Sequence, residues 1–230
     1  MRRLIKWLFQ LMRLKQLKKI QFLKRNLKKV KLQRVKKFLI AAAKNLIHQM
    51  IQAQKKTQKS HNQMYNLCVI GLGNPGPKYH NSRHNIGKDF MFDISKKFFK
   101  EFDEKLKLEA LVGESHDNKV LWAIPTNYMN DSGKTISKIL KSTNLKIHDC
   151  IVIHDDLDLD LGSVRLKEGG GHGGHKGLKD IIEKTGKTDF YRIRIGISHP
   201  GIKEEVTNWV LNKFSPEEKI LINRLIALLM

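Results

Sequence analysis

Cysteine is scarce in this 230-residue sequence, and the first 66 residues contain no acidic residue, no glycine and no proline. The two cysteines, Cys68 and Cys150, are too few for a disulfide scaffold or for a zinc site made of cysteines, and they favour a reducing compartment over secretion. No stretch approaches the roughly 18–20 uncharged apolar residues of a membrane-spanning helix. No clean apolar segment follows the basic start either, so a secretory signal is not indicated.

Positive charge is concentrated at the N-terminal end. Residues 1–66 contain 19 Lys and Arg, whereas residues 67–230 contain 25 basic and 22 acidic residues. Almost all of the formal net charge of +22 therefore belongs to the first 66 residues. With 40% hydrophobic residues overall, the near-neutral part can bury an ordinary core. We predict a basic extension with its linker over 1–66 and one globular domain over 67–230.

The basic extension has helical periodicity. From Leu4 to Val30, apolar residues recur every three or four positions with Lys and Arg between them. This pattern predicts one or two amphipathic helices, followed by a polar linker over 54–66. Such helices bind anionic membranes, act as mitochondrial transit peptides, or bind nucleic-acid phosphates. A partly disordered Lys-rich tail is the alternative. Charges interrupt even the apolar side, for example at residues 17–20, which favours RNA over a membrane.

The rest of the chain alternates between strand-like and helical patterns. Strand-like runs occupy 67–72, 120–124, 150–156, 163–167 and 190–197. Helical periodicity is found at 86–102, about 132–143, 174–185, 203–212 and 216–229. Some of the strand-like runs are continuously apolar, as expected for strands that are covered on both faces. The alternation predicts a single α/β domain with a mixed, mostly parallel twisted sheet flanked by helices.

The first strand-like run leads into a loop that matches GxGxxG at residues 71–76. Two prolines interrupt the chain where a dinucleotide-binding helix would have to begin, and no acidic residue ends a second strand at the required distance. The nicotinamide-cofactor interpretation therefore fails. What remains is a tight loop that presents Asn74, then Tyr79, and then His84 at a predicted helix start.

Two further polar motifs follow strands. Residues 125–133 form a loop containing Met129 and Asn130, and Asn130 taken alone would be an ordinary turn residue. Residues 154–160 read HDDLDLD. Clustered carboxylates suggest a site for a hard cation, but the spacing does not match an EF-hand loop. A single carboxylate, Asp155, that orients a distant histidine is the alternative.

The fourth motif is the glycine-rich segment 169–177, GGGHGGHKG. Its two histidines are three residues apart and could bind a metal, but no third ligand follows at a convincing spacing. The segment also lacks the GK[ST] ending of a P-loop. A flexible loop without function is the alternative. Glycines would let backbone N–H groups approach a bound ligand closely.

Together these motifs resemble the bacterial-type peptidyl-tRNA hydrolase family from about residue 67 to 215. The segments GLGNPGPKYHNSRHNIG, PTNYMNDSGK, HDDLDLDLGSVRLKEGGGHGGHKGLKDI and FYRIRIGISHPG occur in the order and spacing of that family. The resemblance implies a single-domain α/β fold. It also implies hydrolysis of the ester that joins a peptide to the terminal ribose of tRNA, with no metal and no other cofactor.

The resemblance also implies roles for individual residues. Ester hydrolysis near neutral pH needs a base for water, and His is the natural one. His84 is implied as that base and Asp155 as the carboxylate that orients it. Asn74 and Asn130 are implied to hold the nucleophilic water and the peptide backbone or ester carbonyl. The implied substrate-binding residues are Tyr79, Met129, Gly171, His175 and Lys176 in the cleft, with Lys167 and Arg194 as a basic pair for the tRNA 5′-phosphate.

Two departures from the family pattern bear on activity. Lys176 stands where bacterial members usually carry Asn, and a Lys, with three donors and no acceptor, cannot make the same bonds. The chain also stops at IALLM, where family members continue, so we expect one wall of the cleft to be missing or shortened.

The favoured interpretation is a peptidyl-tRNA hydrolase of organellar translation that recycles tRNA. A mitochondrial location is expected, with the cytoplasm as the alternative. The alternative function is a weakened or inactive homologue that serves as a mitochondrial ribosomal protein. Its extension, residues 1–66, would then bind ribosomal RNA in the large subunit.

Overall fold

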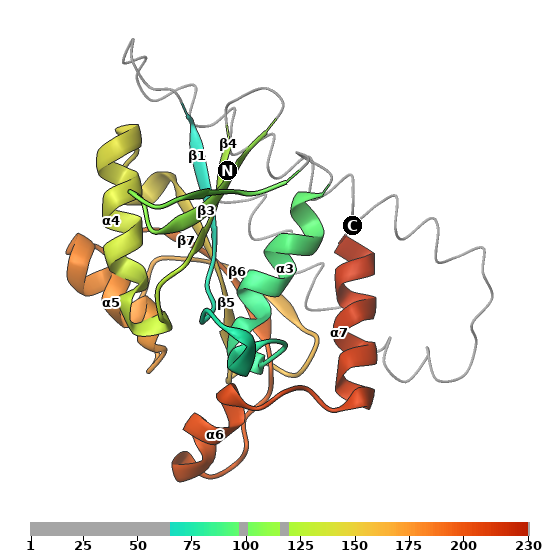
Figure 1. Cartoon of the computed structure of the whole chain (residues 1–230). Helices are drawn as coiled ribbons and strands as arrows, with labels where there is room; N and C mark the ends of the chain where they lie inside the picture. The colour runs from blue at the N-terminus through green and yellow to red at the C-terminus, as the bar shows by residue number, and fades with distance from the viewer. Residues whose placement is uncertain (1–64, 97–100, 116–119, 230) are drawn as a thin grey trace, which may run out of the picture.

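The computed structural model describes residues 65–96, 101–115 and 120–229 (Figure 1). The helices predicted for the extension and most of the predicted linker lie outside the described residues. Tyr65 is only 6% exposed and packs in the core, so the packed part of the chain includes residues just before the first strand. None of the helices in the described ranges is long and apolar enough to cross a membrane.

A seven-stranded sheet forms the centre of the domain, in the order β2-β3-β4-β1-β5-β7-β6. The four strands β4, β1, β5 and β7 pair in parallel, and the edge pairs β2–β3, β3–β4 and β6–β7 are antiparallel. Strand β2 runs in the same direction as these four, because it is antiparallel to β3, which is antiparallel to β4. Five strands thus run in one direction and two in the other, which confirms the predicted mixed sheet. The strand bounds are β1 Leu67–Gly71, β2 Asp103–Lys105, β3 Ala110–Glu114, β4 Val120–Pro125, β5 Cys150–Asp156, β6 Val164–Glu168 and β7 Tyr191–Gly196.

Helices cover both faces of the sheet (Figure 1). The α-helix bounds are α3 Ile86–Ser95, α4 Ser132–Thr143, α5 Lys176–Thr185, α6 Val206–Leu211 and α7 Pro216–Leu229. Helices α4 and α5 pack on one face, and α3 and α7 pack on the other. Short 3₁₀ turns are η1 Pro77–Tyr79, η2 Arg83–Asn85, η3 Met129–Asp131, η4 Ile147–Asp149 and η5 Lys203–Glu205.

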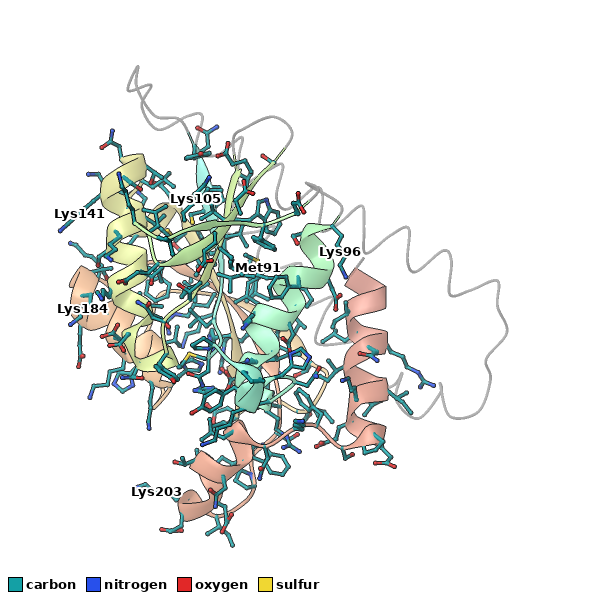
Figure 2. The ribbon with its side chains drawn as sticks, viewed as in Figure 1. Met91, Lys96, Lys105, Lys141, Lys184 and Lys203 are labelled. Carbon is teal, nitrogen blue, oxygen red and sulfur yellow. The ribbon has the colours of Figure 1, made fainter. Side chains whose placement is uncertain are left out.

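The core is divided by the sheet into two buried clusters. Along β1, Cys68 and Ile70 belong to the cluster beside α4 and α5, whereas Leu67 and Val69 belong to the cluster beside α3 and α7. This is the two-residue alternation of a strand that is covered on both faces. Met91 of α3 points into the second cluster, whereas Lys141 and Lys184 lie on the outer surface of α4 and α5 (Figure 2).

The sequence patterns were wrong in one region. The helix predicted over 86–102 ends at Ser95, and residues 101–102 lead into β2 instead. Strands β2 and β3 were not predicted. Strand β2 consists of three exposed charged residues, and β3 is five residues long with a glycine inside it, so neither has the apolar pattern of the other strands. Pairing with β4 and with each other makes them strands.

The sheet brings the predicted functional loops to one edge. The carboxyl ends of β1, β4 and β5 are adjacent there because these strands are parallel neighbours. Strand β1 leads to α3 on one face, and β4 leads to α4 on the other. Such a reversal at the carboxyl edge of a sheet is the usual position of a ligand site in α/β folds.

Candidate active site

A cavity of about 550 Å³ opens at the carboxyl edge of the sheet. It is lined by every residue that the sequence motifs singled out as functional: Asn74, Tyr79, His84, Met129, Asn130, Asp155, Lys167, Gly171, His175, Lys176 and Arg194. These residues come from six separate segments of the chain, and the fold brings all of them to one place.

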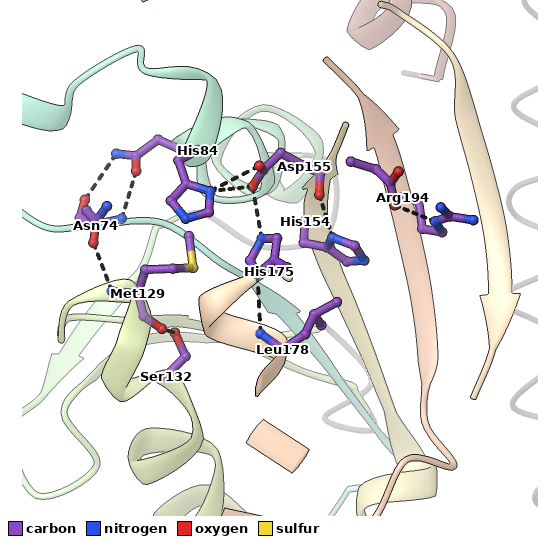
Figure 3. A network of polar contacts seen from close by, with 11 residues as sticks. Asn74, His84, Met129, Ser132, His154, Asp155, His175, Leu178 and Arg194 are labelled. Carbon is purple, nitrogen blue, oxygen red and sulfur yellow. Dashed lines mark hydrogen bonds and ion pairs between the residues drawn. The ribbon is translucent and has the colours of Figure 1, made fainter. Parts of the chain in front are cut away.

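His84 and Asp155 line the cavity and belong to one network of polar contacts (Figure 3). The Nδ1 atom of His84 lies 2.9 and 3.0 Å from the two carboxylate oxygens of Asp155. An ionised carboxylate is only an acceptor, so Nδ1 carries the proton and donates it. The Nε2 atom of His84 is then an unprotonated acceptor. This is the tautomer that a general base requires.

The glycine-rich segment places a second imidazole on the same carboxylate. The Nε2 atom of His175 lies 3.0 Å from Oδ1 of Asp155 (Figure 3). His175 is also the N-cap of α5, and its Nδ1 accepts a hydrogen bond from the backbone N–H of Leu178 at 3.3 Å. Because Nδ1 is an acceptor, Nε2 must be the donor to Asp155. One buried carboxylate therefore fixes the tautomers of two histidines.

Electrostatics support an ionised Asp155 between the two histidines. Burial acts to raise the pKa of Asp155, but the charge interactions and hydrogen bonds with His84 and His175 outweigh it and hold this pKa well below its usual range. The neighbouring His154 is also buried, and its Nδ1 donates to the Asp155 carbonyl at 2.6 Å. Burial first, and His175 second, lower the pKa of His154 to about 3, so it is neutral near pH 7.

The position of His84 depends on a close approach between α3 and β5. His84 lies in η2, directly before α3, and a Cβ on Gly87 would be 2.3 Å from the carbonyl oxygen of Ile153. No side chain fits there. Glycine therefore lets the first turn of α3 pack against the backbone of β5, which puts His84 within reach of Asp155.

The loop after β1 is held to the same turn by paired amide bonds. The backbone N–H of Asn74 donates to Oδ1 of Asn85 at 2.7 Å, and Nδ2 of Asn85 donates to the Asn74 carbonyl at 3.0 Å. The side-chain Oδ1 of Asn74 accepts from the backbone N–H of Met129 at 2.8 Å. The bond to Met129 fixes the orientation of the Asn74 side-chain amide. Its NH₂ group remains available to donate into the cavity.

The loop after β4 forms the opposite side of the cavity. Met129 is 2% exposed, and its sulfur packs so closely on Gly177 that a Cβ there would lie 2.6 Å from Sδ. Asn130 is exposed on the cavity surface next to it. Tyr79 and Tyr128 meet edge to face at 6.2 Å between ring centroids and add an aromatic wall. The cavity thus has both amide donors and apolar surface.

Basic side chains line the other end of the cavity, on strands β6 and β7. In the antiparallel register Lys167 pairs with Arg192, and Arg165 pairs with Arg194, so the predicted partners Lys167 and Arg194 share a face without being directly opposite. Arg194 donates to Asp156 at 2.5 Å and also lies 3.9 Å from Asp158. Of the two predicted phosphate ligands, only Arg194 is paired with carboxylates within the described residues.

Lys176 is exposed at the first position of α5 and lines the cavity between these two ends. No carboxylate of the described part of the chain lies within ion-pair distance of its ammonium group; the nearby acids pair with Arg194, His84 and His175 instead. An unpaired cation at this place attracts anionic groups, whereas the Asn usual in the family would offer both a donor and an acceptor.

The nitrogen and oxygen ligand atoms of His84, Asp155 and His175 lie within 4.8 Å of one another, which is a grouping that can hold a metal ion. In the tautomers assigned above, protons occupy both nitrogens that face the carboxylate. A metal there would displace these protons and remove the bond that orients His84. The arrangement is complete as a hydrogen-bond network. The carboxylates of the run 154–160 are divided between two groups of partners: Asp155 bonds to the two histidines, whereas Asp156 and Asp158 lie against Arg194.

Three supporting residues were not found by sequence reasoning. Asn85 bridges two loops, His154 packs against His175 at 5.0 Å between ring centroids, and Arg192 donates to the Gly170 and Gly171 carbonyls. Arg192 is 2% exposed and fixes the glycine-rich segment. A signal was present for Arg192: it alternates with isoleucines in a strand covered by helices, where an arginine needs partners.

The fold and the site define an α/β domain with a histidine–carboxylate pair that can activate water in a cleft with a basic end. A sequence model of the family described as peptidyl-tRNA hydrolase matches residues 68–230. A curated peptidyl-tRNA hydrolase of Coxiella burnetii is 41% identical over 155 residues, which is 67% of this chain and 81% of the relative. One of Francisella tularensis is 44% identical over 154 residues, with 66% and 80% covered.

A solved structure gives the same assignment. The crystal structure of peptidyl-tRNA hydrolase from Acinetobacter baumannii superposes with a TM-score of 0.66 at 36% identity, covering 73% of this chain and 86% of that one. The chain therefore belongs to the peptidyl-tRNA hydrolase family, which confirms the resemblance found in the motifs.

Proposed function

We propose that this chain hydrolyses the ester bond between a peptide and the terminal ribose of tRNA. The observation that carries this proposal is the pairing of His84 with Asp155, which leaves Nε2 of the imidazole unprotonated at a cavity with amide donors. The relatives named above are peptidyl-tRNA hydrolases, and the family model matches residues 68–230, which contain the whole site.

In the proposed reaction, His84 Nε2 removes a proton from water while the water oxygen attacks the ester carbonyl carbon. Asn74 holds the water through its side-chain NH₂, and Asn130 donates to the carbonyl oxygen as negative charge develops on it. The C–O bond to the ribose then breaks. The imidazolium of His84 returns its proton to the ribose oxygen, which yields a peptide carboxylic acid and free tRNA.

The basic end of the cavity suits the phosphate groups of tRNA. Lys167 is half-buried there, and Arg194 reaches the same surface from β7. Charge-assisted hydrogen bonds to phosphate would hold the nucleic acid in register with the ester.

The direct test is release of free tRNA from purified peptidyl-tRNA by the full chain, compared with His84→Ala and His148→Ala. His148 is an exposed histidine in η4, at the other edge of the sheet, and serves as the matched control. Activity in the wild type and in His148→Ala, with loss in His84→Ala, supports the proposal. No activity in the folded wild type would contradict it.

Lys176 supports a second candidate, a catalytically weakened homologue that serves as a mitochondrial ribosomal protein. Its unpaired charge stands beside His175 in place of a neutral amide. The variant Lys176→Asn decides between the candidates. A large gain in turnover would mean that the wild type is weakened, and an unchanged or lower turnover would mean that Lys176 is compatible with the enzyme.

We further propose that the chain acts in mitochondria and that residues 1–60 are retained and bind ribosomal RNA. The 19 positive charges of residues 1–66, with no acidic residue among them, support a polyanionic partner. N-terminal sequencing of the organellar protein tests retention, because a mature N-terminus near residue 60 would identify a cleaved transit peptide. Deletion of 1–60 should release the protein from the large ribosomal subunit at moderate salt.

A further inference from the structure

Arg83 directly precedes the base His84, yet its side chain bonds entirely to the C-terminal segment 209–218. It is 5% exposed, and its Nη2 lies 2.6 Å from a carboxylate oxygen of Glu218 at the start of α7. Its Nη1 lies within hydrogen-bond distance of three backbone carbonyls, those of Trp209 at 3.3 Å, Asn212 at 3.4 Å and Lys213 at 3.0 Å.

Aromatic contacts and the backbone reinforce this attachment. The guanidinium carbon of Arg83 lies 3.8 Å from the centre of the Trp209 ring and 5.3 Å from that of Phe214. The backbone N–H of Arg83 donates to the Asn212 carbonyl at 3.0 Å, next to an isolated β-bridge between Ser82 and Lys213. The turn that carries His84 and the chain after α6 are therefore joined along their length.

Helix α6, whose last residues begin this segment, reaches the cavity, with Val206, Thr207, Val210 and Leu211 on the cavity wall. Figure 1 shows α6 at the bottom of the molecule, with the chain passing from it to α7. The helix has six residues, none of them buried, and no side-chain cap. A helix this short is not stable by itself, so its position depends on contacts outside it.

We propose that Arg83 is a positioning residue that holds the α6 wall of the cleft at a fixed place relative to His84. A planar guanidinium can bond three carbonyls and a carboxylate while it stacks on an aromatic ring, which an ammonium group cannot do. The turn that carries His84 and the α6 wall then keep a fixed relative position. A substrate held against α6 therefore has its ester near His84. This inference rests on the proposed function.

Hydrogen exchange of the full chain tests the positioning without any substrate. In Arg83→Lys, the amides of α6 should exchange faster, while those of β1 and β5 stay protected as in the wild type. Glu218→Gln keeps the bonds from Arg83 to the carbonyls and should give a smaller increase. The matched control is Glu183→Gln, which breaks the exposed pair of Lys179 and Glu183 on α5 and should change nothing in α6.

Kinetics of peptidyl-tRNA hydrolysis give the second readout. For folded Arg83→Lys we expect KM to rise about tenfold, the factor that corresponds to roughly 1.4 kcal/mol. The pH profile of kcat should stay the same, because the bond between His84 and Asp155 is intact. Unchanged α6 exchange would overturn the proposal, and so would an unchanged KM in an active enzyme. Absence of activity in the wild type would refute the proposed function instead, while the exchange result would still decide the role of Arg83.

Discussion

At the histidine end of the cavity, the polar groups already have partners: Asp155 accepts from two imidazoles, and Asn74 is bonded through its backbone and its side-chain oxygen. At the basic end, Lys167 has no carboxylate partner among the described residues, and Arg194 is paired with Asp156. The same cavity thus combines a region whose central side chains are oriented by hydrogen bonds with one whose charges are only partly compensated.

The two ends place different demands on the protein. A base must hold one tautomer within hydrogen-bond reach of the reacting water, and bonds made in advance reduce the cost of arranging it during the reaction. Phosphate anchoring needs positive charge that a ligand can reach, and its strength falls with salt. Variants at the two ends should therefore fail in different ways: in turnover at the histidine end, and in affinity and salt dependence at the basic end.

The largest effect is expected for His84→Ala. Removal of a general base typically lowers the rate by about 10²–10⁴-fold. Binding of tRNA should change little, because the basic end is untouched. Turnover and tRNA affinity measured on the same preparation check both statements. Near-wild-type turnover would refute the mechanism, and a large loss of tRNA affinity would mean that the two ends are not separable.

Asp155→Asn should lower turnover by less than His84→Ala, because the base remains. An amide has only one acceptor oxygen. With this oxygen at the place of Oδ1 the NH₂ opposes the Nδ1–H of His84, and in the flipped orientation it opposes both histidines. The bond that orients His84 is weakened in either case. A pH profile of kcat for this variant should differ in shape from that of the wild type. An identical profile and rate would show that Asp155 does not orient His84.

Most of the sheet could be predicted from the sequence. The alternation of apolar runs and helical periods predicted the sheet, its mixed pairing and five strands, because buried strands and amphipathic helices are repeated patterns. It missed β2 and β3, whose strand conformation depends on pairing with β4 more than on their own residues. Residues 101–102 were assigned to a helix by periodicity alone, and the structure places them before β2.

Within the site, the motifs identified residues that reach the cavity but not those that support them. Asn74, His84 and Asp155 lie in recognisable loops at strand ends. Arg83 and Asn85 flank His84 in the same motif, yet their partners are 11 to 135 residues away in sequence. Such long-range contacts leave no periodic pattern. The pairing of Arg194 with Asp156, across neighbouring strands, likewise depends on the register of β5 and β7.

The basic end should respond more to Lys167→Ala than to Arg194→Ala. Each phosphate contact that is lost reduces the salt slope of binding by about one unit. Arg194 is already engaged with Asp156, so a phosphate must compete with that carboxylate for its guanidinium, whereas Lys167 has no carboxylate partner among the described residues. Asp156→Asn should conversely strengthen tRNA binding at low salt. Binding measured over a range of salt concentrations checks the three variants together.

A larger loss of tRNA affinity in Arg194→Ala than in Lys167→Ala would contradict this expectation. That result would mean that phosphate displaces Asp156 and binds the Arg194 guanidinium in its place. Equal salt slopes in all three variants and the wild type would show that neither basic residue contacts phosphate. Turnover at saturating substrate should stay close to the wild-type value in Lys167→Ala, because the histidine end is unchanged.

The smallest effect concerns His154, which lies behind the histidine end and is expected to influence stability more than activity. Burial lowers its pKa to about 3, below the ordinary value of 6.5, so between these pH values the unfolded chain binds a proton that the folded chain does not. The free energy of unfolding therefore falls as the pH is lowered through this window, by up to about 1.4 kcal/mol per pH unit. His154→Gln removes this titration and should flatten the dependence between pH 6 and 4.

Urea unfolding of the two proteins at several pH values measures the difference. Burial raises the pKa of Asp89 to about 6, so this residue stabilises the folded state as the pH falls, which is the opposite sign. It is present in both proteins and cancels in the comparison. The exposed His148→Gln is the matched control. If His154→Gln retained the slope of the wild type, His154 would be protonated in the folded protein over this pH range, and the histidine end would carry a positive charge next to Asp155.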